Sequence, residues 1–162
     1  MEHWVIDSGR GGASLDAAAA AAVVACIGSA ERTALAAAML ALARRVSAAR
    51  CCTIFCFEAE RGPRLLSGAH CGDAWGVLRT AARYTREFSA HDGVRAALRA
   101  HGAGLPPAAG AQAPQRLLLH RQRAAQLAHA GYREACYDSQ GVGERLAVLA
   151  RVGPDCWLAT HL

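Results

Sequence analysis

The run CCTIFCF at residues 51–57 limits the folds open to this chain more than any other feature. It is apolar, β-branched and aromatic, and it lacks the period of an amphipathic helix, so it predicts a strand that is buried on both faces. Side chains alternate along a strand, which places Cys52, Ile54 and Cys56 on one face and the other four side chains opposite them. Helices must cover at least one face of the sheet that contains this strand.

The remaining elements follow from apolar spacing and from capping or turn residues. We expect helices over 16–27, 30–49, 73–88, 89–101 and 131–137, and strands over 51–57, 64–71, 116–122, 145–151 and 155–162. A helix continues from the strand at 116–122 to 129, although a helix over that whole stretch fits the pattern equally well. The order predicts an α+β domain with a single antiparallel sheet of about five strands flanked by helices.

The length of 162 residues fits one domain. We expect a flexible segment at 1–13 and one domain over 14–162, with helices in 14–49 and an α+β sheet region in 50–162. Three prolines in the stretch 102–115 predict a long loop of the kind that often covers a site. The final strand runs to Leu162 without a polar tail, which we interpret as a truncated chain that lacks a further domain.

Charge and cysteine usage narrow the class of protein. All 18 basic residues are arginine, and they are scattered among 13 acidic residues, which does not indicate a nucleic-acid surface. The seven cysteines are odd in number and irregularly spaced, which favours reduced thiols in the cytoplasm. The apolar stretch 17–27 is too short to span a membrane, and the acidic residues before it do not fit an export signal.

No catalytic or cofactor motif stands out. His70 and Cys71 are adjacent, so on a strand their side chains diverge and do not form a nucleophilic pair. The histidines and cysteines lack metal-ligand spacing, and the glycines at 9–12 and 141–143 lack the context of a phosphate-binding loop. Paired carboxylates for acid and base catalysis are not evident either. We therefore predict no enzyme activity, no metal and no cofactor, and we leave an unidentified small-molecule ligand open.

Five segments carry a resemblance to a known family. They are YTREF at 84–88, DGV at 92–94, HRQRAA at 120–125, YREACY at 132–137 and GERL at 143–146. In this order they resemble the N-terminal sensory region of bacterial LuxR-type transcriptional regulators, over roughly residues 50–162. The resemblance implies a GAF-like or PAS-like sensory fold, a pocket between sheet and helices, dimerisation through N-terminal helices, and promoter binding by a C-terminal helix-turn-helix domain absent from this chain.

Aromatic residues with polar tips and nearby basic groups would suit the wall of a ligand pocket. The candidate ligand-binding residues are Trp75, Tyr84, Phe88, His120, Arg121, Tyr132 and Tyr137. Aromatic residues at helical spacing fit an ordinary core equally well, and the arginines fit ion pairs. The apolar face of the second helix gives the candidate dimer interface, which comprises Leu35, Met39, Leu42 and Val46.

The leading hypothesis is a non-catalytic sensory domain that binds a small molecule or partner and passes the signal through a homodimer. One alternative is a dimerisation or interaction module without a ligand. Another is a haem sensor or a thiol redox sensor that uses Cys51, Cys52, Cys56 and Cys71. A hairpin symmetric about residue 61 would place Cys51 opposite Cys71, and a slip of one residue would remove that relation.

Overall fold

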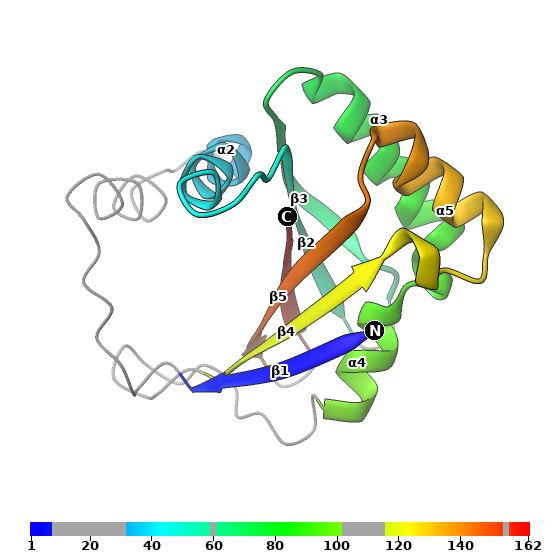
Figure 1. Ribbon diagram of the computed structural model, residues 1–162. Helices are drawn as coiled ribbons and strands as arrows, with labels where there is room; N and C mark the ends of the chain where they lie inside the picture. Colours follow the sequence, from blue (N-terminus) through cyan, green and yellow to red (C-terminus); the bar gives the residue numbers. More distant parts are fainter. Residues whose placement is uncertain (8–31, 59–60, 102–115, 154–155) are drawn as a thin grey trace.

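The computed structural model describes residues 1–7, 32–58, 61–101, 116–153 and 156–162. The helix expected over 16–27 and the loop expected over 102–115 lie outside these residues. The described part contains a sheet with helices on both of its faces (Figure 1).

The sheet confirms the α+β prediction and has six strands instead of about five. The strands are β1 Glu2–Asp7, β2 Cys51–Glu58, β3 Arg64–His70, β4 Arg116–Arg123, β5 Glu144–Gly153 and β6 Cys156–His161. They pair in the order β1-β4-β5-β6-β2-β3, and every pair is antiparallel. The extra strand is β1, which falls in the segment expected to be flexible. It pairs with β4 along its length, and Glu2 lies 3.5 Å from the guanidinium of Arg121.

The described helices fall into two groups. They are α2 Arg32–Ala43, α3 Ala74–Arg83, the π-helix η1 Tyr84–Phe88, α4 Gly93–His101, α5 Ala130–Cys136, and the short 3-10 turns η2 Ser89–His91, η4 Ala124–Gln126 and η5 Asp138–Gln140. Helix α2 lies against one face of the sheet, whereas α3, α4 and α5 lie on the other (Figure 1).

Three predicted helix boundaries are wrong. The helix expected over 30–49 ends at Ala43, where the Ser47 hydroxyl donates a hydrogen bond to the Ala43 carbonyl (2.8 Å). Ser89 belongs to a 3-10 turn, and Asp92 instead accepts the backbone N–H of Val94 at the start of α4. The helix expected to continue to 129 is a single 3-10 turn at η4.

Strand β2 separates the two parts of the core, as its sequence predicts. Cys52 and Ile54 pack with the buried Ala36 and Leu40 of α2. On the other face, Phe55 joins the larger core cluster beneath α3 and α5, together with Phe57. Both faces of this strand are therefore buried.

The β2–β3 hairpin does not have the symmetric register. A shift between Ile54 and Phe55 places Cys51 opposite His70. Cys71 lies one residue beyond β3, where its backbone N–H donates to the carbonyl of Arg50 (2.9 Å). The slip of one residue therefore removes the proposed Cys51–Cys71 pairing.

The candidate dimer face of α2 is divided between the sheet and solvent. Leu35 and Met39 are partly buried against the sheet of the same chain, and Leu42 is half-buried. Val46 lies beyond the end of the helix and is 88% exposed. Of these four side chains, Val46 is the one fully available to a partner.

Truncating the contact between α2 and the sheet should destabilise the domain. We expect Leu40→Ala to lower the free energy of unfolding by about 2–4 kcal/mol, because it leaves a cavity above Cys52 and Ile54. The matched control is Val46→Ala, which removes an exposed side chain and should leave the urea midpoint unchanged. Equal midpoints for the two variants would contradict this packing of α2.

Candidate functional site

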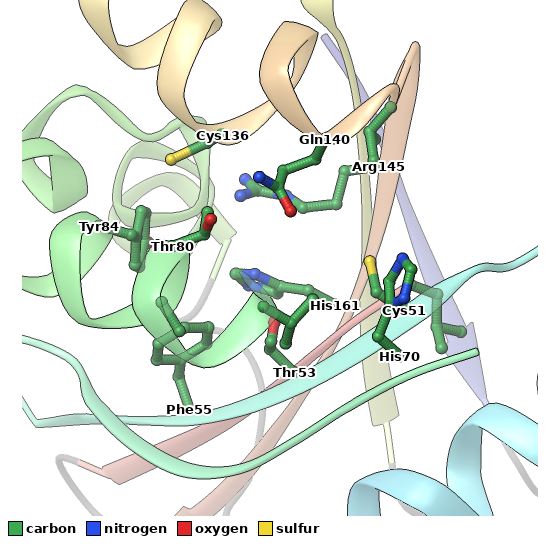
Figure 2. Close-up of a pocket in the computed structure, with 14 residues that line it drawn as sticks. Cys51, Thr53, Phe55, His70, Thr80, Tyr84, Cys136, Gln140, Arg145 and His161 are labelled. Carbon is green, nitrogen blue, oxygen red and sulfur yellow. The ribbon is translucent and has the colours of Figure 1, made fainter. Parts of the chain in front are cut away.

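A cavity lies between the sheet and the helices that cover its larger core. Its volume is about 80 Å³, several times the room that one water molecule needs. The lining residues come from four strands of the sheet, β2, β3, β5 and β6, and from the α3 and α5 regions: Cys51, Thr53, Phe55, His70, Val77, Thr80, Ala81, Tyr84, Cys136, Gln140, Val142, Arg145, His161 and Leu162. Figure 2 shows side chains from the sheet and from both helical regions around one space.

Strand alternation brings two polar side chains to this cavity. On β5, Arg145 has the same parity as the buried Ala147 and Leu149, so all three face the core. On β6, His161 has the same parity as the buried Ala159. An arginine and a histidine therefore stand where the pattern calls for apolar residues, and Figure 2 shows both at the cavity.

Arg145 is held by a buried polar network. Its Nη2 donates to Asp92 Oδ1 (2.6 Å) and to Gln122 Oε1 (3.1 Å), and its Nη1 donates to the Tyr132 hydroxyl (3.0 Å). The Arg145 side chain is 12% exposed and the Asp92 side chain is fully buried. The Tyr137 hydroxyl also donates to Gln122 Oε1 (3.0 Å). The guanidinium is thus fixed in position, and its charge is balanced by Asp92.

Asp92 is ionised although it is buried. Burial by itself raises the pKa of a carboxyl group, but the positive charge of Arg145 opposes this effect. The hydroxyl of Tyr84 donates to Oδ2 (2.6 Å) and the N–H of Val94 to Oδ1 (3.1 Å), and the balance lowers the pKa of Asp92 to about 2. Tyr84 therefore lines the cavity and also supports the ion pair.

Two buried nitrogens at the cavity have no hydrogen-bond partner among the described residues. They are Nε of Arg145 and Nε2 of His161. Burial, reinforced by the charge of Arg145, holds the pKa of His161 well below its usual range, so its imidazole is neutral. Burial disfavours the charged form of Arg145 as well, but Asp92 outweighs it and raises the arginine pKa, so the guanidinium stays charged. The Nε–H of Arg145 is consequently a donor aimed at no protein acceptor in the described structure.

The two thiols at the cavity are protonated. Burial raises the pKa of Cys136 to about 11 and also raises the pKa of Cys51, in both cases against the opposing charge of Arg145. A thiol with a raised pKa holds little thiolate at neutral pH and therefore reacts slowly. At neutral pH these cysteines mainly contribute polarisable wall atoms to the cavity.

The predicted aromatic residues have different positions. Tyr84 lines the cavity. Phe88, Tyr132 and Tyr137 are buried in the adjoining core cluster, where Tyr132 and Tyr137 contact the polar network. Trp75 lies near the start of α3 and is 75% exposed, so it is not part of the cavity wall.

The predicted basic residues lie away from the cavity on β4. His120 is buried, and its Nδ1 lies 3.0 Å from Nδ1 of His3 on β1. Arg121 points to the opposite side of β4, where its Nη2 lies 2.7 Å from Glu144. Neither side chain lines the cavity.

Sequence reasoning missed four polar residues of the site. Asp92, Gln122 and Arg145 lie in segments that carry the family resemblance, which gives them no individual role. His161 is predicted only as a strand residue. A signal was present, because Arg145 and His161 each interrupt an apolar face at a spacing of two residues.

The candidate redox cysteines lie in different surroundings. Cys52 is buried beneath α2, Cys51 lines the cavity, and Cys71 is exposed beyond the hairpin. Cys56 instead approaches a residue that the sequence did not suggest, Cys156 on β6, with 3.3 Å between the two sulfur atoms. The strands therefore pair residues 100 positions apart in the chain.

Within the described ranges, no group of three or more histidine, cysteine or acidic side chains is arranged to hold a metal ion. None of the helices that the structure describes is long and apolar enough to cross a membrane. Among the described residues, no aspartate or glutamate lines the cavity, so it offers no carboxylate to a hard cation. The carboxylate of Asp92 already accepts hydrogen bonds from Arg145, Tyr84 and Val94.

Comparison with known proteins gives a match in structure. No protein-family model and no curated sequence matches the chain. Among solved structures, the VqsR LBD domain from Pseudomonas aeruginosa is similar, with 11% sequence identity and a TM-score of 0.56, over 90% of this chain and 79% of that chain. This likeness does not point to a GAF or PAS fold specifically. At so low an identity it establishes one conclusion, that the chain shares the fold of the VqsR LBD domain.

Proposed function

We propose that this chain is a non-catalytic sensory domain that binds a small, neutral and largely apolar molecule in the cavity. The observation that carries the proposal is the pair of buried nitrogens without partners, Nε of Arg145 and Nε2 of His161. An unsatisfied buried polar group costs about 1–3 kcal/mol, and a bound acceptor would remove that cost at the Nε–H of Arg145. The ligand would therefore carry a carbonyl or similar oxygen beside an apolar body.

Charge argues for a neutral ligand. Asp92 already balances Arg145 at 2.6 Å, and His161 is neutral because its pKa is lowered. An anion entering the cavity would lose its hydration without finding an uncompensated positive charge. A neutral acceptor loses less hydration and can still accept the Nε–H of Arg145.

Size argues for a small ligand. The cavity volume of about 80 Å³ is well below the roughly 300–1,000 Å³ typical of sites for drug-sized molecules. Phe55, Val77 and Ala81 supply apolar wall for a short hydrocarbon portion. A molecule of a few carbons fits these dimensions without rearrangement of the helices.

We propose that the domain is the sensory part of a transcriptional regulator. The fold shared with the VqsR LBD domain and the resemblance of five segments to LuxR-type sensory regions support it. In this setting the domain acts in the cytoplasm as a homodimer, with the exposed Val46 beyond α2 in the interface, and a separate domain binds promoter DNA. A ligand would transmit a signal only through different affinities for two arrangements of that dimer.

Short amides test the ligand class. Butyramide should raise the melting temperature of the wild-type protein in a dose-dependent way, whereas butyrate, its anionic counterpart of the same length, should not. Thr80→Trp fills the cavity from α3 and should abolish the shift. The matched control Arg79→Gln, at an exposed position on the same helix, should retain it.

Two outcomes would contradict the proposed ligand binding. A shift with butyrate but not with butyramide would contradict the neutral-ligand proposal. If neither compound binds and mass spectrometry of the denatured purified protein finds no co-purified small molecule, the chain is better explained as a dimerisation module.

A further inference from the structure

Cys56 and Cys156 form a thiol pair across two neighbouring strands. In the β2–β6 register, Cys56 faces Leu158 and Glu58 faces Cys156, so the two cysteines are diagonal neighbours. Their sulfur atoms are 3.3 Å apart. Cys56 is 5% exposed, whereas Cys156, the first residue of β6, is partly exposed. One thiol is thus accessible to solvent and the other lies directly behind it.

We infer that Cys56 and Cys156 form a reversible disulfide when the protein meets hydroperoxides. The S–S bond length is about 2.05 Å, so the sulfurs must approach by a little over 1 Å. Cys156 stands at the end of its strand, next to Gly153, its partner on β5, where the β5–β6 register is irregular. A strand end with an irregular register can shift by this amount more readily than a strand centre.

The chemistry needs two steps and one peroxide. The Cys156 thiolate attacks an oxygen of hydrogen peroxide, the O–O bond breaks, and hydroxide leaves, which gives a sulfenic acid on Cys156. The Cys56 sulfur then attacks the Cys156 sulfur, the S–O bond breaks, and the hydroxyl leaves as water with the Cys56 proton. Overall, two thiols and one peroxide give one disulfide and two water molecules.

The groups around the pair control its rate. Burial, together with the neighbouring Cys56 thiol and Glu58, raises the pKa of Cys156 to about 11, and Arg64 on β3 partly opposes this. The paired residue on β5 is Gly153, which adds no charge. Because the thiolate is the reactive form, oxidation should be slow at pH 7 and should become about tenfold faster for each unit by which the pH rises towards that pKa.

The bond would join strands distant in sequence. Cys56 and Cys156 lie 100 residues apart, so the crosslink closes a long loop and restricts the unfolded chain. Both strands also reach the cavity, β2 through Phe55 and β6 through His161. The inference does not rest on ligand binding, since the two sulfurs belong to residues outside the cavity wall.

Peptide mapping tests the bond directly. The reduced full chain is incubated with hydrogen peroxide at pH 8.5, alkylated, and digested with trypsin without reductant. Cleavage after arginine gives the peptides 51–61 and 152–162, and we expect them to be linked with a loss of two hydrogens. Fragmentation must assign the link to Cys56, because Cys51 and Cys52 lie in the same peptide.

Stability and reversal provide a second readout. The oxidised protein should melt roughly 5–10 °C above the reduced protein, and dithiothreitol should reverse the shift. Cys156→Ser should lose both the link and the shift. Cys71→Ser, which removes an exposed cysteine elsewhere, should retain both. A link to Cys51 or Cys52, or oxidation of Cys156 to sulfinic acid while Cys56 stays alkylatable, would overturn the inference.

Discussion

Replacing Arg145 with methionine is expected to lower the free energy of unfolding by about 3–5 kcal/mol. The substitution leaves Asp92 ionised and buried without its 2.6 Å partner, and it removes donors from Tyr132 and Gln122. Domains of this kind are typically stable by about 5–15 kcal/mol in total, so much of the stability would be lost. Urea denaturation followed by circular dichroism measures the change.

Two further variants separate the ion pair from general damage to the core. In Asp92→Asn with Arg145→Met, no buried charge remains, so the double variant should be more stable than the sum of the single effects predicts. The matched surface control is Arg121→Met on β4, whose ion pair with Glu144 is exposed, and its urea midpoint should hardly move. Additive single effects would show that Asp92 and Arg145 are not coupled.

Acid should destabilise the domain at pH values above those at which Asp92 takes up a proton. Burial, with the charge of Arg145, lowers the pKa of His120 to about 4, and the pKa of His161 is lowered in the same direction. A histidine with a lowered pKa takes up its proton more easily in the unfolded chain. Its stabilising contribution is therefore complete above about pH 6.5 and is lost as the pH falls towards 4.

The size of the acid effect can be checked by substitution. The pKa of His120 implies a loss of about 3 kcal/mol across this range, and His161 adds to it. Asp92 contributes a further loss only between about pH 4 and 2. Urea midpoints from pH 7 to 4 should fall less steeply in His120→Gln. The control Val46→Ala, at an exposed position without a titratable group, should keep the wild-type slope. A flat wild-type profile would show that neither buried histidine is held neutral.

The α+β architecture could be predicted because several strands carry strong local signals. The apolar run at 51–57 requires burial on both faces, and the structure places it between two core clusters. The strand β1 gives a weaker signal, since its pairing with β4 joins residues more than 100 positions apart and is invisible to local periodicity. The register of the β2–β3 hairpin depended on one irregularity between Ile54 and Phe55, which no turn residue announces.

The candidate site was predictable only in part. Tyr84 was identified as an aromatic residue with a polar tip, and it does line the cavity. Arg145 was not predicted as a site residue, because a charged residue on a strand usually faces solvent. Its spacing of two and four residues from Ala147 and Leu149 nevertheless places it on the buried face. The partners Asp92 and Arg145 lie 53 residues apart, so only the tertiary fold shows that their charges meet.

The order of the strands determines when the sheet can form during synthesis on the ribosome. The last strand in sequence, β6, lies between β5 and β2 in the interior of the sheet. Until β6 is synthesised, the hairpin β2–β3 and the unit β1-β4-β5 are not joined. The edges of β2 and β5 that β6 later covers then expose unpaired backbone N–H and C=O groups, which favours aggregation. Co-translational folding of the sheet must therefore wait until β6 has been synthesised, and chaperone binding to nascent chains should be strongest just before β6 appears.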